Sequence, residues 1–111
     1  MNYRDQVKQK LKDFDEYDII ISSHALIRIR QRQIGQHEIL ENILNPQRLE
    51  YAILENSSDE GERFDCYFIY SKTLCHRYVM VIKDSVIVVT AIKIHRKWQS
   101  IVERKLRSWA I

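Results

Sequence analysis

The sequence predicts one α+β domain, an antiparallel sheet of about four strands with a helical hairpin packed on one side and a C-terminal helix. The chain has 111 residues, a usual length for one domain, and 45% of them are apolar, enough to fill one core. Helical spacing dominates both ends of the chain, while short β-branched and aromatic runs occupy the middle. With only two glycines and one proline, no linker is visible, so residues 1–111 form one unit.

The N-terminal part predicts a short helix followed by a short strand. Four apolar residues recur at helical spacing from near Asn2: Tyr3, Val7, Leu11 and Phe14. We interpret residues 1–18 as a peripheral helical addition. The β-branched run at residues 19–21 then predicts a strand.

A helical hairpin follows. Ser22 and Ser23 offer an N-cap for a helix of roughly residues 24–34, which Gly35 interrupts. A second apolar stripe, of Ile39, Leu40, Ile43 and Leu44, stops at Asn45–Pro46 because a proline cannot continue the helix.

The pattern then changes to strands, at about residues 49–54, 64–70, 76–82 and 86–94. A polar loop at 56–61 and turns at 71–73 and 83–85 separate them. Such short connections predict an antiparallel meander.

Residues 96–109 return to helical spacing, and we interpret residues 96–111 as a second peripheral addition. Five apolar residues fall within one arc: Trp98, Ile101, Val102, Leu106 and Trp109; Lys105 also lies inside it. Each tryptophan buries about 150 to 250 Å². We therefore expect this face to pack on the domain or on a second subunit, the latter giving a homo-oligomer.

Composition also bears on location. Cys66 and Cys75 are the only cysteines, which is not a disulfide framework and favours a reducing compartment. The N-terminus has no apolar run, and runs such as Val86–Val89 are far too short to span a bilayer. We expect a cytoplasmic protein with no membrane partner.

Charge is segregated along the chain, although the net charge is only +3. Residues 22–34 hold three arginines and no acid, and six Lys or Arg residues from Lys93 onward face only Glu103. Acids gather instead at residues 13–18 and 55–65. This distribution favours a polyanionic partner.

Three residues of the first hairpin helix form a cationic edge. At 100° per residue, His24, Arg28 and Arg32 fall within about 80° of each other. A solvated basic edge would show the same spacing, so both interpretations stay open.

The pattern Ser-x-His-Ala-x-x-Arg-x-x-x-Arg-x-Ile at residues 22–34, with the helix, the meander and Val88-Val89-Thr90-Ala91-Ile92, resembles a small uncharacterised domain family. That family is similar to the RelE, BrnT and barnase-like ribonuclease toxins. The resemblance covers about residues 19–94. One departure is Gln33, where the family commonly has glycine.

The resemblance implies a toxin-type endoribonuclease that needs no metal or cofactor and that a cognate antitoxin protein binds. The ribose 2′-hydroxyl would attack the adjacent phosphate and leave a 2′,3′-cyclic phosphate, so the enzyme supplies a base, an acid and cations. His24 would be the base, Arg28 and Arg32 would hold phosphate, and Thr90 would match the family's terminal-strand threonine.

Residues near the chain's basic end are candidates for RNA contact, together with one more arginine of the helix: Arg30, Lys93, His95 and Arg96. Strand alternation places Thr90 on the face opposite Lys93 and His95, so only one set can face the first hairpin helix. Following the resemblance, we expect Thr90 to face it. A buried strand threonine is the alternative.

Other chemistry is less well supported. Cys75, His76 and Arg77 are adjacent on a strand and so alternate between faces, which argues against a metal site. Tyr51, Tyr67, Tyr70 and Tyr78 would stack on bases or, alternatively, pack in the core. The rival functions are a non-catalytic nucleic-acid-binding module and a protein-interaction domain with an acidic partner.

Overall fold

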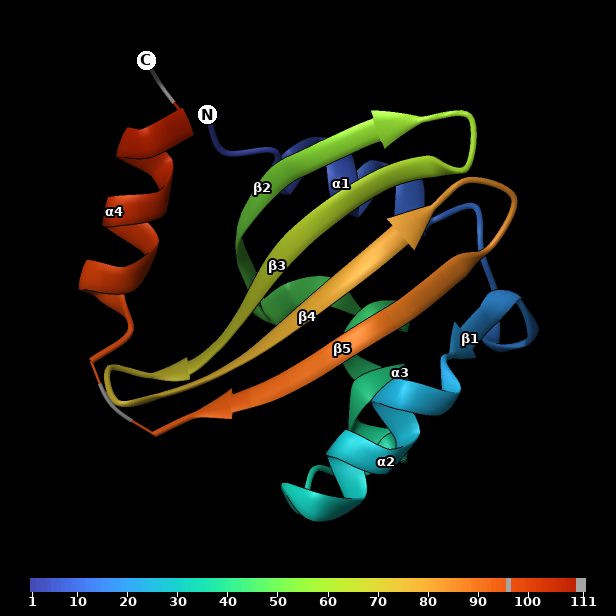
Figure 1. The fold of residues 1–111 in the computed structure, drawn as a ribbon, viewed down its shortest axis with the longest axis horizontal. Helices are drawn as coiled ribbons and strands as arrows, with labels where there is room; N and C mark the ends of the chain where they lie inside the picture. The colour runs from blue at the N-terminus through green and yellow to red at the C-terminus, as the bar shows by residue number, and fades with distance from the viewer. Residues whose placement is uncertain (96, 110–111) are drawn as a thin grey trace.

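The computed structural model describes residues 1–95 and 97–109, without the side chains of Ser108 and Trp109, and confirms the α+β class (Figure 1). Its helices are α1 (Arg4–Leu11), α2 (Ser23–Gln31), α3 (Gln36–Leu44) and α4 (Gln99–Trp109), with short 3₁₀ turns η1 (Glu16–Asp18) and η2 (Pro46–Arg48). Its strands are β1 (Ile19–Ile21), β2 (Leu49–Ser58), β3 (Gly61–Ser71), β4 (Leu74–Ile82) and β5 (Val86–Ile94).

The sheet has five strands, in the order β1-β5-β4-β3-β2, and is mixed. The expectation of about four antiparallel strands was therefore wrong in two respects. Strands β2 to β5 form the expected meander, but β1 joins the outer side of β5 in parallel, with Ile19 opposite Val86. Short connections predict pairing only between strands that follow each other in the sequence. The pairing of β1 with β5 could not be predicted in this way, because the two strands are distant in sequence and only the fold brings their backbones together.

The polar stretch after residue 54 is a continuation of the sheet and not the predicted loop. Ser57 pairs with Glu62 and Ser58 with Gly61, leaving a tight turn at Asp59–Glu60. Gly61 has φ 127, and an added Cβ there would lie 2.7 Å from the Ile82 carbonyl oxygen, so glycine is required. The paired residues face water, and for that reason they show no apolar alternation.

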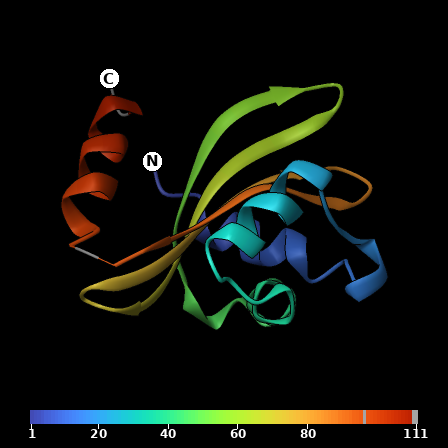
Figure 2. The same cartoon turned by 60° about the horizontal axis from the view of Figure 1, so that its bottom comes forward.

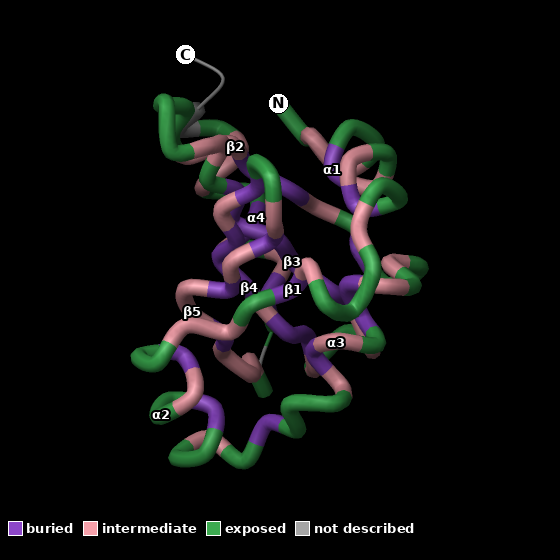
Figure 3. Tube along the Cα trace, turned by 90° about the vertical axis from the view of Figure 1, so that its right-hand side faces the viewer, coloured by how far each residue is buried: buried purple, intermediate pink, exposed green. Residues whose placement is uncertain are grey.

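The main core lies between the sheet and helices α1, α2 and α3 (Figure 2). The two hairpin helices contribute Ile29, Ile39 and Ile43, which cluster with Phe64, Phe68, Tyr78 and Met80 from the strands. Val7 and Leu11 of α1 are also buried there, so this helix is part of the core. Figure 3 shows the buried residues following the strands and one side of each helix.

Helix α4 covers the other sheet face through a second, smaller cluster. Trp98 and Val102 pack with Ile53, Tyr67 and Cys75. The Trp98 indole Nε1 donates a hydrogen bond to the Ser71 carbonyl oxygen at 2.8 Å. The expected packing on the domain is thus confirmed for the described part of this helix; the side chain of Trp109 lies outside it.

The structure bears on the cysteines and on membrane-spanning segments. Both cysteines are free and buried, Cys66 in the main core and Cys75 under α4. Among the described residues, no helix is long and apolar enough to cross a membrane.

Candidate functional site

Helix α2 presents part of the predicted cationic edge to solvent. The Ser22 side chain caps the helix by accepting a hydrogen bond from the Ala25 amide at 3.1 Å. Ala25 and Ile29 face the sheet, which leaves His24, Arg28 and Arg30 exposed. These three side chains are free to meet a polyanion.

Arg32 serves a different purpose from Arg28. It lies at the C-terminal end of α2, is partly buried, and donates a hydrogen bond from Nη1 to the Ala91 carbonyl oxygen of β5 at 2.9 Å. The guanidinium therefore ties α2 to the edge of the sheet. About 12 Å of helix axis separates it from His24, because each residue advances the helix about 1.5 Å.

The end of α2 also explains the departure at Gln33. Its φ is 55, in the left-handed region, and the Ile34 amide donates to the Ile29 carbonyl at 3.0 Å while the Gln33 amide donates to Arg30 at 3.4 Å. These two bonds define a Schellman motif, whose left-handed position usually holds glycine. The turn expected from a glycine is thus formed by glutamine.

Thr90 does not face α2, so the expected orientation was wrong. It pairs with Val79, which pairs with Asp65, and Asp65 bonds Lys105 of α4. Directly opposed strand residues share a face, so Thr90 lies on the α4 side. A register shift beside Val89 sets this orientation, because Val79 pairs with Thr90 whereas Met80 pairs with Val88.

The alternation then places Lys93 and His95 on the face of α2 and α3. Lys93 pairs with His76, whose neighbours on its own face include Tyr70, Tyr78 and Glu38. Lys93 is partly exposed and His95 is exposed. The fourth residue expected to contact RNA, Arg96, lies outside the described residues.

A polar network that sequence analysis missed lies beneath α3. Asn42 Nδ2 donates hydrogen bonds to the Tyr70 hydroxyl at 2.8 Å and to the Tyr78 hydroxyl at 2.9 Å. The Tyr70 hydroxyl donates to Glu38 Oε2 at 3.0 Å. His76 Nδ1 lies 2.7 Å from the Tyr78 hydroxyl, and its Nε2 lies 3.9 Å from Glu38 Oε1.

The network assigns the protons on His76. The buried Tyr78 oxygen already accepts from Asn42, so its own hydrogen is left to donate to His76 Nδ1. The neutral imidazole then carries its proton on Nε2, on the side of Glu38. Burial lowers the pKa of His76, Glu38 opposes this, and Lys93, Arg48 and His95 lower it further.

Cations surround this network. The Arg48 guanidinium carbon lies 4.1 Å from the centre of the Tyr70 ring, a cation–π contact. Lys93 lies across the strand pair from His76. The Glu38 side chain is 43% exposed, so its carboxylate lies at the outer rim of the network, next to solvent. Arg48, Lys93 and His95 lie near enough to this rim to lower the pKa of His76. We call Glu38, Arg48, His76, Lys93 and His95 the rim cluster.

One sequence signal could have revealed the network. Asn42 is a polar residue on the apolar stripe of α3, beside Ile39 and Ile43. A buried amide needs partners, which Tyr70 and Tyr78 supply, and His76 lies two residues from Tyr78 on the same face of β4.

Other candidate chemistry finds little support. Cys75 and His76 do point to opposite faces, as predicted, and among the described residues no three His, Cys, Asp or Glu side chains gather to hold a metal ion. Tyr67 and Tyr78 are fully buried and hydrogen-bonded, so they offer no stacking platform.

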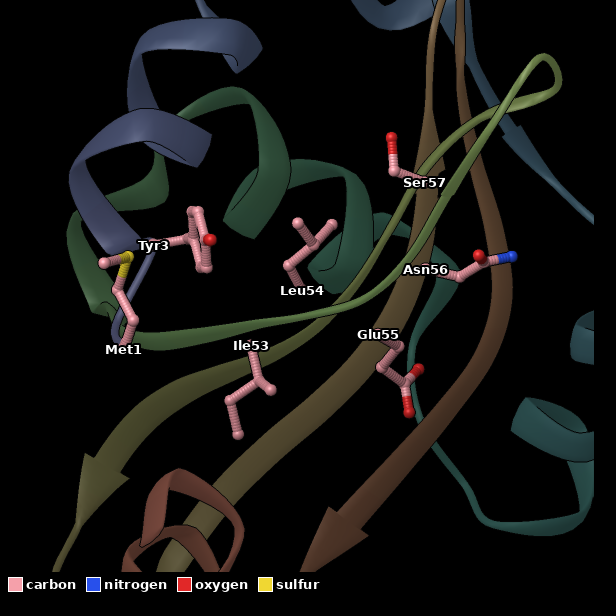
Figure 4. A pocket seen from close by; sticks show the side chains of 7 residues that line it. All are labelled: Met1, Tyr3, Ile53, Leu54, Glu55, Asn56 and Ser57. Atoms are coloured by element: carbon pink, nitrogen blue, oxygen red, sulfur yellow. The ribbon is translucent and has the colours of Figure 1, made fainter. Parts of the chain in front are cut away.

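One hollow of the surface lies away from the rim cluster. Figure 4 shows it beside β2, at the opposite edge of the sheet from β5. Its lining consists of Met1, Tyr3, Ile53, Leu54, Glu55, Asn56 and Ser57, with one acidic and no basic side chain. It does not suit a phosphate.

We compared the chain with protein families, curated proteins and solved structures. No family model, no curated protein and no solved structure matches the chain.

Proposed function

We propose that the protein is a metal-independent endoribonuclease that binds RNA phosphates over the exposed side of α2 and the end of β5. The observation that carries this proposal is the rim cluster, where a partly exposed carboxylate, a neutral histidine and several cations meet. Cleavage by the 2′-hydroxyl needs a base, an acid and positive charge near the phosphate, and these residue types supply all three.

The proposed division of roles follows from exposure and charge. Glu38 would accept the proton of the 2′-hydroxyl as its oxygen attacks the phosphorus, and His95 would donate a proton to the departing 5′-oxygen. Arg48 and Lys93 would balance the charge that develops on the phosphate. His76 orients this end of the site through Tyr78. Arg28 and Arg30 would bind neighbouring phosphates.

His24 is the competing candidate for the base, as the family resemblance implies. It lies at the far end of α2 from Arg32, and Arg32 itself is engaged with Ala91. Comparing Glu38→Gln with His24→Ala therefore locates the chemistry. Glutamine keeps the acceptor for the Tyr70 hydroxyl, so the fold of this variant should survive.

The experiment incubates a single-stranded RNA with the purified chain in the presence of a chelator. We expect cleavage with 2′,3′-cyclic phosphate ends, and no cleavage of the same oligonucleotide made as DNA. Glu38→Gln should lower the rate by about 10²-fold or more while leaving binding intact, as expected for loss of a general base.

Matched controls separate catalysis from charge. Arg28→Ala should weaken binding, whereas Arg104→Ala, which removes an exposed cation from α4, should leave cleavage unchanged. A preparation that never cuts RNA contradicts the proposal. Full activity in Glu38→Gln together with loss in His24→Ala would return the base to α2.

A second candidate is a non-catalytic nucleic-acid-binding module. It is favoured by the internal satisfaction of the network, since Asn42, Tyr70 and Tyr78 bond one another and would be stable without substrate. RNA and DNA would then bind alike, weaken steeply with added salt, and remain intact.

A further inference from the structure

The second half of β5 leaves the sheet with an open edge. Strand β1 pairs only with residues 86–88 of β5, and the Ser22 amide extends this pairing to the Val88 carbonyl at 3.0 Å. In Figures 1 and 2, α2 lies beside β5, and no other described strand continues along this side. Residues 90–94 are each only partly buried, apart from Ala91.

The direction of the backbone groups follows from two hydrogen bonds. The Ala91 carbonyl points outward, because Arg32 reaches it from α2. Backbone groups alternate along an antiparallel strand, so Ile92 turns inward to Arg77 and Lys93 turns outward. The amide and carbonyl of Lys93 therefore lie on the open edge, where an added strand would bond them, whereas Ala91 is fully buried.

Side chains flanking this edge define what such a strand should carry. On the α2 and α3 face stand Arg32, Lys93 and His95, together with one acid, Glu38, which lies beside His76. On the α4 face stand the β-branched residues Thr90, Ile92 and Ile94. A strand seated here would place alternate side chains beside cations and beside apolar groups.

We propose that the outer edge of β5 around Lys93 binds an extended segment of a partner protein in which acidic and β-branched residues alternate. The acidic side chains would face Lys93 and Arg32, and the apolar ones would face Ile92 and Ile94. A second copy of β5 is a poorer occupant, because it would bring lysine and histidine of one copy against those of the other. The inference does not depend on ribonuclease activity.

The probe for this edge is a capped peptide of about seven residues in which glutamate and valine alternate. We expect it to bind the full chain, to slow hydrogen exchange at the Lys93 amide and to leave exchange in β2 unchanged. A peptide of the same composition with all glutamates before all valines should bind at least tenfold more weakly, since it cannot match both faces.

Two substitutions at one position separate backbone from charge. Lys93→Ala removes the cation and keeps the outward amide, and Lys93→Pro removes both while sparing the pairing with β4. We expect Lys93→Pro to bind the peptide about threefold to tenfold more weakly than Lys93→Ala, the effect of one hydrogen bond. Should Lys93→Pro fail to fold, the same comparison is made on the native chain with a peptide N-methylated at alternate amides.

Several results would overturn the proposal. Equal binding of the alternating and block peptides would mean simple charge attraction. Equal binding by Lys93→Ala and Lys93→Pro, or by the methylated peptide, would exclude strand addition, and so would no binding at millimolar peptide. Protection of the Lys93 amide that rises with protein concentration alone would assign the edge to a second copy of the chain.

Discussion

Buried polar groups are stabilised differently on the two faces of the sheet. Under α3, a set of neutral groups, Asn42, Tyr70, Tyr78 and His76, bonds one another. Under α4, Asp65 is 1% exposed and charged groups meet it, with Arg77 Nε at 2.6 Å and Lys105 Nζ at 2.7 Å. In the neutral network each buried donor must have an acceptor, whereas in the ionic cluster each buried charge must have an opposite charge beside it.

The difference also explains Lys105, the cation inside the apolar arc of α4. Burial opposes its charge, but the hydrogen bonds to Asp65 and Tyr67 and the negative charge of Asp65 together outweigh that effect and raise the pKa of Lys105. For Arg77, the hydrogen bond to Asp65 and the neighbouring negative charges together outweigh burial in the same way and raise its pKa. Both cations lie beside Tyr67, whose hydroxyl also donates to Asp65 at 3.3 Å. The ion pair thus fixes where α4 docks.

The largest effect should come from breaking the ionic face. Asp65→Ala leaves Arg77 and Lys105 without their carboxylate in a partly buried place, and both keep some access to water. We expect a loss of about 2 to 4 kcal/mol in the free energy of unfolding. Urea denaturation measures it, and hydrogen exchange should show α4 loosened first.

Glu103→Ala is the matched control for that measurement, because it removes an exposed acid from α4. Its effect should stay within about 0.5 kcal/mol. If Asp65→Ala were as mild as Glu103→Ala, the ionic face would contribute nothing to stability.

The neutral face should respond less strongly. Asn42→Ala removes the donor to Tyr70 and Tyr78, and we expect it to cost about 1 to 3 kcal/mol. Asn45→Ala, which removes only an exposed bond to Glu41, should change stability by less than about 0.5 kcal/mol. Equal effects in the two variants would show that the network is not needed for folding.

A dependence on pH should distinguish the faces further. The pKa of His76 is lower in the fold than in the unfolded chain, so the unfolded state binds more protons as the pH falls below about 6.5. Stability should therefore decrease from pH 7 to pH 5. Chemical denaturation at both pH values should show this slope diminished in His76→Gln and retained in His37→Gln, whose parent histidine is exposed on α3.

The smallest effect concerns the backbone beside the neutral face. Gln33→Gly relieves a left-handed residue and should raise stability by about 0.5 to 1 kcal/mol. Gln31→Gly, within α2, should lower stability by a similar amount. Thermal unfolding of the two variants should show shifts of opposite sign, and a destabilising Gln33→Gly would contradict the strain argument.

Most of what the sequence alone determined was local. Periodicity located the four helices of the described residues and the four strands of the meander, because side-chain repeats of 3.6 and 2 residues reflect which face of each element is buried. Turn residues separated the strands, and segregated charge marked α2 and the end of β5 as cationic. The polar hairpin tip was missed because its paired residues face water on both sides.

Only the tertiary structure decided the contacts between distant segments. It placed β1 beside β5, turned Thr90 toward α4 through the register shift beside Val89, and engaged Arg32 with Ala91. It also gathered Glu38, Arg48 and His76 from α3, η2 and β4 into one cluster. Side-chain periodicity carries no record of such pairings, because they arise when separate surfaces pack and buried polar groups must find partners.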